Sequence, residues 1–226
     1  MAPPTLKYFN LRGRGEVIRL LFAYKGVEYN EEEIDYQAMK SASGSEEFPF
    51  GQAPVLVDGD LHLAQMDTIL RYLAREHGLY GSNNREKALI DMVLGGVESI
   101  RGDYGDLIYK GELKDDAKKE YATVHFAAES VTTRNGGAHF QYLENFLKRH
   151  NDGAGWAVGD SLTIADIHLF DIVDLHLREQ LFPQEVKDKF PLLVAHHDRV
   201  AKEANIAAYL SSDKRPSQVN GVAGRG

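Results

Sequence analysis

The sequence predicts a chain in two parts, an α/β region followed by an all-α region. Strand-like alternation and helical spacing of apolar residues occur together only in about the first 80 positions. From Arg85 onward the strand signals stop, and apolar residues recur at helical spacing. We therefore predict an α/β domain over 1–81 and a helical domain over 85–226, joined by the polar segment YGSNNRE.

The α/β region begins with a strand, a helix and a second strand. TLKYF alternates and predicts the first strand, and GEVIRLLFAYKG predicts a buried helix that ends at Gly26. VEYNEEEI predicts a second strand, although its acidic run weakens the pattern. Residues 36–51 carry turn-forming and polar types and predict a long loop.

A hairpin and a helix complete this region. PVLVDGDLHLAQ contains two short apolar runs separated by Asp58-Gly59, which is a strong hairpin signal. From Gln65 the apolar residues follow helical spacing as far as Gly78. The predicted order is strand, helix, strand, hairpin, helix.

The second region predicts helices only. One long apolar stripe begins after Asn83, which with Glu86 forms a plausible helix cap. Further helices are predicted over 115–134, 138–150, 163–180 and 191–203, with a break at TRNGGAH. Thr163 and Asp166 have the spacing of a capping box, which we interpret as a folding device. The final segment SDKRPSQVNGVAGRG has the composition of a terminal tail.

Composition excludes several functional classes. The chain has 226 residues and a net charge of −8, which argues against a general nucleic-acid or anionic-membrane binder. It has 0 cysteines, so thiolate metal sites and cysteine nucleophiles are excluded, and a reducing cytoplasm is favoured. No apolar run approaches the length of a transmembrane helix, and the N-terminus lacks a signal-peptide core.

Three motifs contain residue types that can bind a ligand or a metal. Gly13-Arg14-Gly15 lacks the third glycine of a dinucleotide fingerprint and the lysine of a P-loop. His196 and His197 are adjacent rather than four apart, so they predict a solvated helix face and no metal site. Tyr8 ends the first strand before a helix, where α/β sheets place ligand-facing groups. A phenol is a good hydrogen-bond donor to an anion such as a thiolate, yet by itself Tyr8 is also compatible with a structural tyrosine.

Five segments together resemble the cytosolic glutathione S-transferases of the tyrosine type. They are YFNLRGRGEVIR, FGQAPVL, AQMDTILRYLAREHGLYG, ALIDMVLGGVESIR and VGDSLTIADI. The opening is similar to the sigma class, whereas the GLYG, DMV-x-x-GVE and LIY segments are similar to the pi class. The resemblance implies a thioredoxin-like N-terminal domain, an all-helical C-terminal domain, and conjugation of glutathione to electrophiles by a homodimer.

The resemblance implies the glutathione site residue by residue. Tyr8 matches the catalytic tyrosine that donates to the glutathione sulfur, and Arg14 matches a supporting arginine. The matched positions for the tripeptide are Gln52, Ala53, Pro54 (a cis-proline in the family), Gln65 and Met66. Free amides at a helix N-terminus favour an anion, which explains how an acidic chain could hold the γ-glutamyl carboxylate.

Several positions depart from the family pattern. Met66 stands where serine or threonine is usual, which removes one hydroxyl donor and about 0.5–1.5 kcal/mol of binding. Met39 and Ser45 stand where a tryptophan and a lysine are expected, and Lys40 is the substitute cation that we consider. Ser99 replaces an acidic residue that reaches the partner subunit, for which Glu98 or Asp103 are candidates.

The resemblance also implies an electrophile pocket and a dimer contact. The matched lining positions are Phe9, Leu11, Tyr36, Tyr104, Gly105 and Tyr109. Gly105 replaces a bulkier residue, which predicts a roomier pocket, and Tyr109 is also explained as part of a helical core stripe. Phe50 matches the aromatic residue that inserts into the partner subunit in some classes.

Two other functions remain open at this stage. The departures at Met39, Ser45 and Met66 are compatible with a weakly catalytic or non-catalytic ligand-binding or structural protein of the same lineage. A glutathione-dependent isomerase or peroxidase would share the site and differ only in its second substrate.

Overall fold

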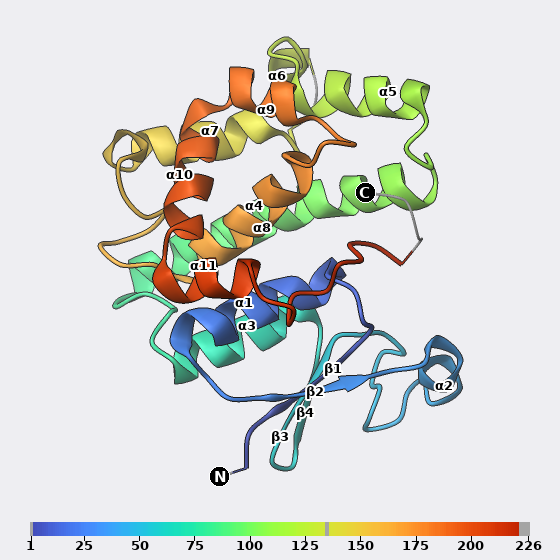
Figure 1. The fold of residues 1–226 in the computed structure, drawn as a ribbon. Coiled ribbons are helices and arrows are strands. Elements are labelled where there is room, and N and C mark those ends of the chain that lie inside the picture. Colours follow the sequence, from blue (N-terminus) through green and yellow to red (C-terminus); the bar gives the residue numbers. More distant parts are fainter. Residues whose placement is uncertain (1, 134–135, 222–226) are drawn as a thin grey trace. The chain divides into compact units, whose positions relative to one another are not determined.

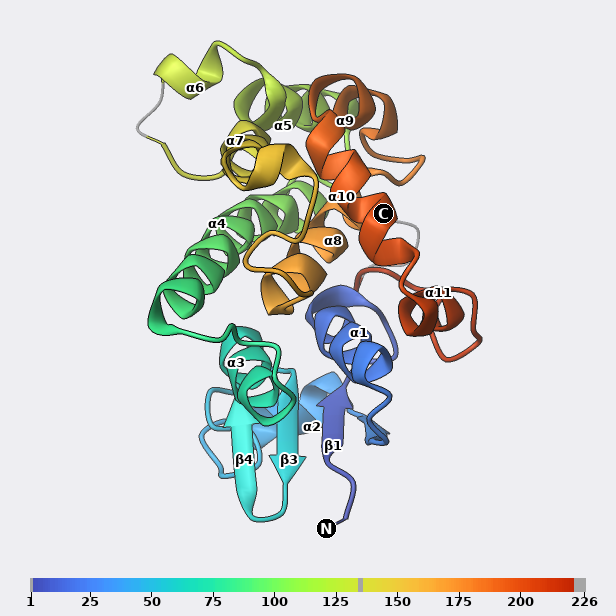
Figure 2. The same cartoon turned by 90° about the vertical axis from the view of Figure 1, so that its left-hand side faces the viewer.

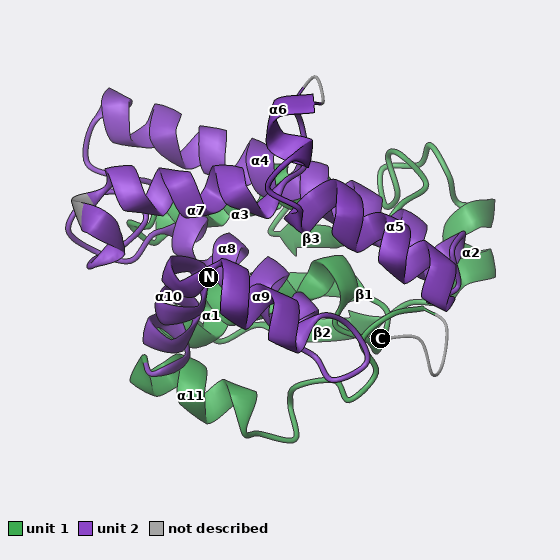
Figure 3. Cartoon of the chain, turned by 90° about the horizontal axis from the view of Figure 1, so that it is seen from above, with its two compact units in different colours: residues 1–79, 203–221 green, residues 80–202, 222–226 purple. Residues whose placement is uncertain are grey.

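The computed structural model describes residues 2–133 and 136–221. The described residues form two compact units, one of residues 2–79 and 203–221 and the other of residues 80–202 (Figure 3). Unit 1 combines a small sheet with helices, and unit 2 is helical, as the sequence predicts (Figure 1).

Unit 1 is built on a four-stranded mixed sheet in the order β2-β1-β3-β4. The strands are β1 (Thr5–Tyr8), β2 (Asn30–Glu33), β3 (Val55–Asp58) and β4 (Leu61–Ala64). β1 pairs in parallel with β2 and antiparallel with β3, which forms a hairpin with β4. Gly59 has a φ of 63°, a conformation that glycine adopts without steric cost, so the Asp58-Gly59 hairpin is confirmed.

Helices cover the apolar side chains of this sheet. α1 (Glu16–Lys25) ends at Gly26, and it lies beside α3 (Met66–Glu76) in both Figure 1 and Figure 2. Side chains alternate along a strand, so Val55 and Leu56 point to opposite faces, and both are fully buried. Val55 and Ala64 pack with Met39 of α2 (Tyr36–Ser41).

The prediction of a long loop over 36–51 was wrong at its start. Asp35 caps α2, because its carboxylate accepts a hydrogen bond of 2.8 Å from the Ala38 amide. Met39 is 3% exposed and anchors this short helix to the sheet. The composition is loop-like because all the other residues of α2 face solvent.

The segment after α10 (Pro191–Ala201), residues 203–221, is a folded part of unit 1 and is called the C-terminal tail below. α11 (Ala204–Leu210), which the sequence did not predict, packs on α1. Beyond it, Val219 and Asn220 are 2% and 6% exposed. The tail-like interpretation of the last residues was therefore wrong as far as residue 221, and residues 222–226 lie outside the described part.

Unit 2 is helical throughout its described residues. Its helices are α4 (Asn84–Tyr109), α5 (Asp115–Phe126), α6 (Ser130–Thr133), α7 (Phe140–Arg149), α8 (Ile164–His176), α9 (Pro183–Lys189) and α10 (Pro191–Ala201), with a 3₁₀ turn over Asn151–Gly153. All residues of α8 except Asp174 are buried, which identifies it as the central helix. No described helix is both long and apolar enough to cross a membrane.

Two predicted helices of this unit needed correction. The helix predicted over 115–134 ends at Phe126, because Ala127 is extended and the Ser130 hydroxyl donates to the Val124 and Ala127 carbonyls. α6 follows separately, and residues 134 and 135 of the TRNGGAH break lie outside the described residues. The helix predicted over 163–180 ends at His176, and the short α9 was not predicted.

Two caps in unit 2 confirm the sequence interpretation. The Asn83 side chain accepts from the Glu86 amide at 3.0 Å and begins α4. Thr163 and Asp166 form a complete capping box at the start of α8. The prediction that His196 lies on a solvated face was wrong, since its Nε2 donates to Asp166 at 2.8 Å and its side chain is fully buried.

Candidate functional site

Tyr8 stands at the end of β1 with its hydroxyl held by the backbone. Its side chain is 6% exposed, and its oxygen accepts a hydrogen bond of 2.9 Å from the Arg14 amide. Accepting this bond polarises the O–H group, which strengthens its own donation to an acceptor. The geometry thus supplies an oriented phenolic donor.

Two glycines make room for the ring. A Cβ placed on Gly15 would lie 2.5 Å from the Tyr8 Cδ1 atom, and one on Gly13 would lie 2.5 Å from the Tyr8 oxygen. Gly13 also has a φ of 40°, a backbone conformation that residues with a side chain rarely adopt. The Gly13-Arg14-Gly15 motif is therefore a backbone frame around Tyr8. The lack of a Cβ atom at Gly13 and Gly15 matters more for this frame than the charge of Arg14.

Arg19 holds the same loop from α1. It is fully buried, and its guanidinium donates to the Leu11 carbonyl at 2.8 Å and to the Phe9 carbonyl at 3.3 Å. Burial lowers the pKa of Arg19, but the hydrogen bond to Glu31 and the charges of Glu31 and Glu16 together outweigh it, so that this pKa is raised. The guanidinium carbon lies 5.7 Å from the centre of the Tyr8 ring.

The first turn of α3 presents the second part of the site. Gln65 precedes the helix with a φ of 72° and ψ of 113°, an uncommon conformation for a residue with a side chain. Its amide group donates to the Gln52 side chain at 3.2 Å, so these two exposed predicted ligands lie together. The Met66 side chain is only 4% exposed, which leaves its backbone, rather than its side chain, to serve a ligand.

The segment before β3 forms the third part. The Ala53–Pro54 peptide is cis, as the resemblance implies. The Lys40 ammonium donates to the Gly51 carbonyl at 2.9 Å and lies 5.6 Å from the centre of the Tyr36 ring. Lys40 is exposed, so it is a cation next to the residues that precede the cis peptide.

The other departures have plain structural explanations. Met39 belongs to the core cluster with Phe48, Val55 and Ala64, so it is a packing residue in this chain. The Ser45 hydroxyl accepts from the Phe48 amide at 3.2 Å and shapes the loop after α2. Glu98 forms an ion pair of 3.0 Å with Arg101 inside unit 2. Asp103 faces His125, with 3.7 Å between its carboxylate oxygen and the His125 Nε2.

The residues predicted to bind an electrophile occur in both units. In unit 1, Phe9 and Leu11 are half-buried, and Tyr36 is 54% exposed. In unit 2, Tyr104 is 4% exposed and Tyr109 is 54% exposed. A Cβ on Gly105 would meet nothing within 4 Å, so open space lies beside that glycine. Phe50, the predicted dimer contact, is 67% exposed.

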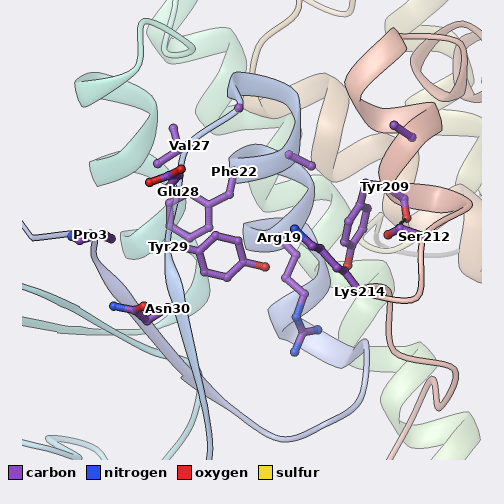
Figure 4. A pocket seen from close by; sticks show the side chains of 13 residues that line it. Pro3, Arg19, Phe22, Val27, Glu28, Tyr29, Asn30, Tyr209, Ser212 and Lys214 are labelled. Atoms are coloured by element: carbon purple, nitrogen blue, oxygen red, sulfur yellow. Dashed lines mark hydrogen bonds between the residues drawn. The ribbon is translucent and has the colours of Figure 1, made fainter.

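A cavity of about 630 Å³ lies elsewhere in unit 1 (Figure 4). It is lined on one side by Arg19, Phe22 and Tyr29, and on the other by Tyr209, Ser212 and Lys214. The Phe22 and Tyr29 rings stack with their centres 4.4 Å apart. None of the predicted glutathione ligands lines it.

Sequence reasoning missed two parts of the site. Arg19 is a cation in the middle of the apolar run VIRLLF, and that position was a usable signal of a buried role. The backbone carbonyls of Gln218 and Val219 accept from the Arg12 and Gly13 amides, both at 2.9 Å. Backbone atoms leave no signature in a sequence, so this contact had no signal.

The fold agrees with the comparisons with known proteins. Residues 4–75 match the model of the glutathione S-transferase N-terminal domain, and residues 105–213 match that of the C-terminal domain. The chain belongs to the glutathione S-transferase family, whose members are transferases that use glutathione as co-substrate.

Within that family the chain is similar to pi-class proteins. Glutathione S-transferase P 1 of Bufo bufo is 37% identical, over 96% of this chain and 97% of its own length. Glutathione S-transferase P of Homo sapiens is 35% identical, over 97% of this chain and 96% of its own. The solved pi-class enzyme of Onchocerca volvulus has a TM-score of 0.79 and 31% identity, covering 92% of both chains. The predicted family and fold are confirmed.

Proposed function

We propose that the chain conjugates the thiolate of glutathione to hydrophobic electrophiles, a detoxification reaction, with Tyr8 activating the thiol. The observation that carries this proposal is the Tyr8 hydroxyl, which is buried and oriented by the Arg14 amide at 2.9 Å. A free thiol has a pKa near ~8.5 and is mostly protonated at neutral pH. A donor aimed at sulfur favours the thiolate, which is the nucleophile.

The tripeptide is assigned to residues of unit 1. The Gln65 side chain and the Met66 amide at the start of α3 serve the γ-glutamyl group, because the helix dipole favours its carboxylate. Gln52 and the backbone of Ala53 beside Pro54 serve the peptide portion, in the manner of an added strand. Arg14 supplies positive charge near the thiol, and Lys40 supplies it at the carboxylate of the glycine residue of glutathione.

The second substrate and the assembly are assigned by resemblance. Phe9, Leu11 and Tyr36 of unit 1, and Tyr104, Gly105 and Tyr109 of unit 2, are the proposed electrophile-binding residues. Phe50 is the proposed dimer contact, because a phenyl ring with 67% exposure is costly in water unless it is covered. The proposed enzyme is a cytoplasmic homodimer, and Phe50→Ala should shift it toward monomer in analytical ultracentrifugation.

Conjugation of glutathione to a chlorodinitrobenzene-type electrophile tests the role of Tyr8. Tyr8→Phe should lower kcat about 100-fold, the loss typical of one positioned donor to a developing anion. It should also raise the pKa of the bound thiol, measured by thiolate absorbance. An unchanged rate and thiol pKa in Tyr8→Phe would contradict the assignment.

A second candidate function is a binding protein that barely catalyses. The observation in its favour is that Met39 and Met66 are both buried side chains without a donor at family ligand positions. The same assay separates the two functions. If the wild-type chain binds glutathione in calorimetry but shows no turnover with several electrophiles, the binding function is correct.

A further inference from the structure

The C-terminal tail is hydrogen-bonded to the loop that carries the Tyr8 frame. The Arg12 amide donates to the Gln218 carbonyl, and the Gly13 amide donates to the Val219 carbonyl, each at 2.9 Å. The Arg12 side chain also donates through Nε to the Pro216 carbonyl at 2.9 Å. Segments about 200 residues apart in sequence are therefore joined by two consecutive backbone hydrogen bonds.

The next amide along this loop is the one that orients Tyr8. Arg14 follows directly after Gly13, and its N–H donates to the Tyr8 oxygen at 2.9 Å. Gly13 itself approaches that oxygen so closely that a Cβ there would lie 2.5 Å away. A small displacement of residues 12 and 13 would thus change both the hydrogen bond and the packing of the hydroxyl.

The tail is also anchored to the start of α1 through a buried carboxylate. Glu16 is fully buried and accepts from the Arg215 Nε at 2.7 Å and from the Tyr209 hydroxyl at 3.0 Å. Burial and the Glu16 charge raise the pKa of Tyr209, so this hydroxyl stays protonated and donates. α1 begins immediately after Gly15, so this anchor lies at the other end of the frame.

Between Tyr209 and Arg215, the two tail residues that bind Glu16, the tail borders a cavity. The cavity of about 630 Å³ separates Phe22 and Tyr29 from Ser212 and Lys214 (Figure 4). The tail is therefore attached through Glu16 and through residues 216–220, where Val219 is 2% exposed. These polar contacts and the buried Val219 side chain hold this segment on the frame.

We propose that the tail segment 215–220 is a positioning element of the catalytic site, which fixes the Arg12–Arg14 backbone and through it the hydroxyl of Tyr8. The inference rests on the proposed role of Tyr8. The tail touches neither substrate nor sulfur in this assignment. It acts only by holding the amide that orients the donor.

Substitutions in the full-length chain test this role. Val219→Ala loosens the apolar anchor, and Arg215→Ala removes the ion pair with Glu16. Each should lower kcat about 3- to 10-fold, as expected for a misaligned catalytic group, with little change in KM for glutathione. Each should also raise the pKa of the bound thiol. Arg215→Lys should restore part of kcat, since an ammonium can pair with the same carboxylate.

Lys214→Ala is the matched control. Lys214 is the neighbouring cation on the same tail, is exposed, and lines the cavity rather than contacting Glu16. It should leave kcat and the thiol pKa as in the wild type. If Val219→Ala and Arg215→Ala change only the melting temperature, or affect kcat no more than Lys214→Ala, the positioning role is overturned.

The double variant Tyr8→Phe/Val219→Ala separates this inference from the proposed function. If the tail acts through the Tyr8 hydroxyl, Val219→Ala should lower kcat in wild type but not further in Tyr8→Phe. A full additional loss in the double variant would overturn the tail's role. An unimpaired Tyr8→Phe single variant would instead overturn the proposed function, and the positioning role with it.

Discussion

Two fully buried carboxylates, Glu16 in unit 1 and Asp166 in unit 2, serve different purposes. Asp166 accepts from the Ala157 amide at 2.6 Å, from the Thr163 amide at 2.8 Å and from His196 at 2.8 Å. Glu16 is bound instead by arginines and a tyrosine, with Arg215 at 2.7 Å and Tyr209 at 3.0 Å.

The difference lies in what each carboxylate connects. Most donors to Asp166 are main-chain or hydroxyl groups within ten residues of it, so the cluster fixes the start of the central helix α8. The tail donors to Glu16 lie near the other end of the chain, and the cluster borders the Tyr8 frame. The first is a folding device, and the second also holds the loop of the proposed Tyr8 site.

Replacement of Asp166 should have the largest effect on stability. Asp166→Ala leaves the Ala157 and Thr163 amides and His196 buried without their acceptor, at a cost of about 3–5 kcal/mol. Urea denaturation measures this loss, and Asp160→Ala on the exposed neighbouring loop is the control. A loss below about 1 kcal/mol would show that the cluster is not a main determinant of stability.

Gly15→Ala should damage activity more than stability. Its Cβ would lie 2.5 Å from Tyr8 Cδ1, so the ring must move, and kcat should fall about 10- to 100-fold. Gly102→Ala on α4 is the matched control, since its Cβ meets open space and alanine favours a helix by about 0.5–1 kcal/mol. Equal activity in both variants would show that the frame does not constrain Tyr8.

Glu16→Ala should cost less stability than Asp166→Ala, about 2 kcal/mol. Arg19 keeps its bond to Glu31, and Arg215 lies on a terminal segment that can move into water. The variant should nevertheless lower kcat, because the tail loses its anchor. Equal losses of stability from the two substitutions, with kcat unchanged, would remove the distinction drawn between the carboxylates.

His176 provides a pH test of a buried polar group without a carboxylate partner. Burial lowers its pKa from 6.5 to about 3, and its ring bonds to Tyr121 at 2.8 Å. Between pH 6.5 and 3 the unfolded chain binds a proton that the folded chain does not. The contribution of neutral His176 to the free energy of unfolding is therefore lost as pH falls from 6.5 towards 3. The free energy of unfolding decreases with a slope of up to about 1.4 kcal/mol per pH unit. His176→Leu should unfold with a shallower acid dependence in urea titrations, whereas parallel curves would contradict the buried neutral state.

The smallest expected effect is at Met66. Met66→Thr adds a hydroxyl at the start of α3, which should lower KM for glutathione by the equivalent of one neutral hydrogen bond, about 0.5–1.5 kcal/mol. It also removes a side chain that is 4% exposed, so the melting temperature should fall. Met92→Thr, at a position 54% exposed, is the control and should change neither. An unchanged KM in Met66→Thr would show that the missing hydroxyl has no bearing on binding.

Much of the fold could be predicted because its signals are local. The Asp58-Gly59 turn, the Gly26 stop of α1 and the Thr163–Asp166 box each depend on residues next to one another. α2 was missed because only Met39 of its residues is buried. α9 and α11 were missed because they are single short helices without a repeated apolar stripe.

The sequence predicted which residues make up the candidate site, but it did not predict the hydrogen bonds that hold these residues in place. Tyr8, Arg14, Gln52 and Gln65 were chosen by resemblance, and the structure adds the Arg14 amide on the Tyr8 oxygen and the Gln65–Gln52 bond. The buried state of His196 was missed, because a polar residue is assigned to solvent unless its distant partner is known.

The sequence by itself determined the order of the strands and of the longer helices, the family and the identity of the phenol at the end of the first strand. Those properties reside in residue types and short spacings. Only the tertiary structure decided that Gly13 and Gly15 clear space for Tyr8, that Arg19 and Glu16 are buried, and that the tail is hydrogen-bonded to the loop after Tyr8. These depend on backbone atoms and on contacts between distant segments, which side-chain patterns along the chain do not encode.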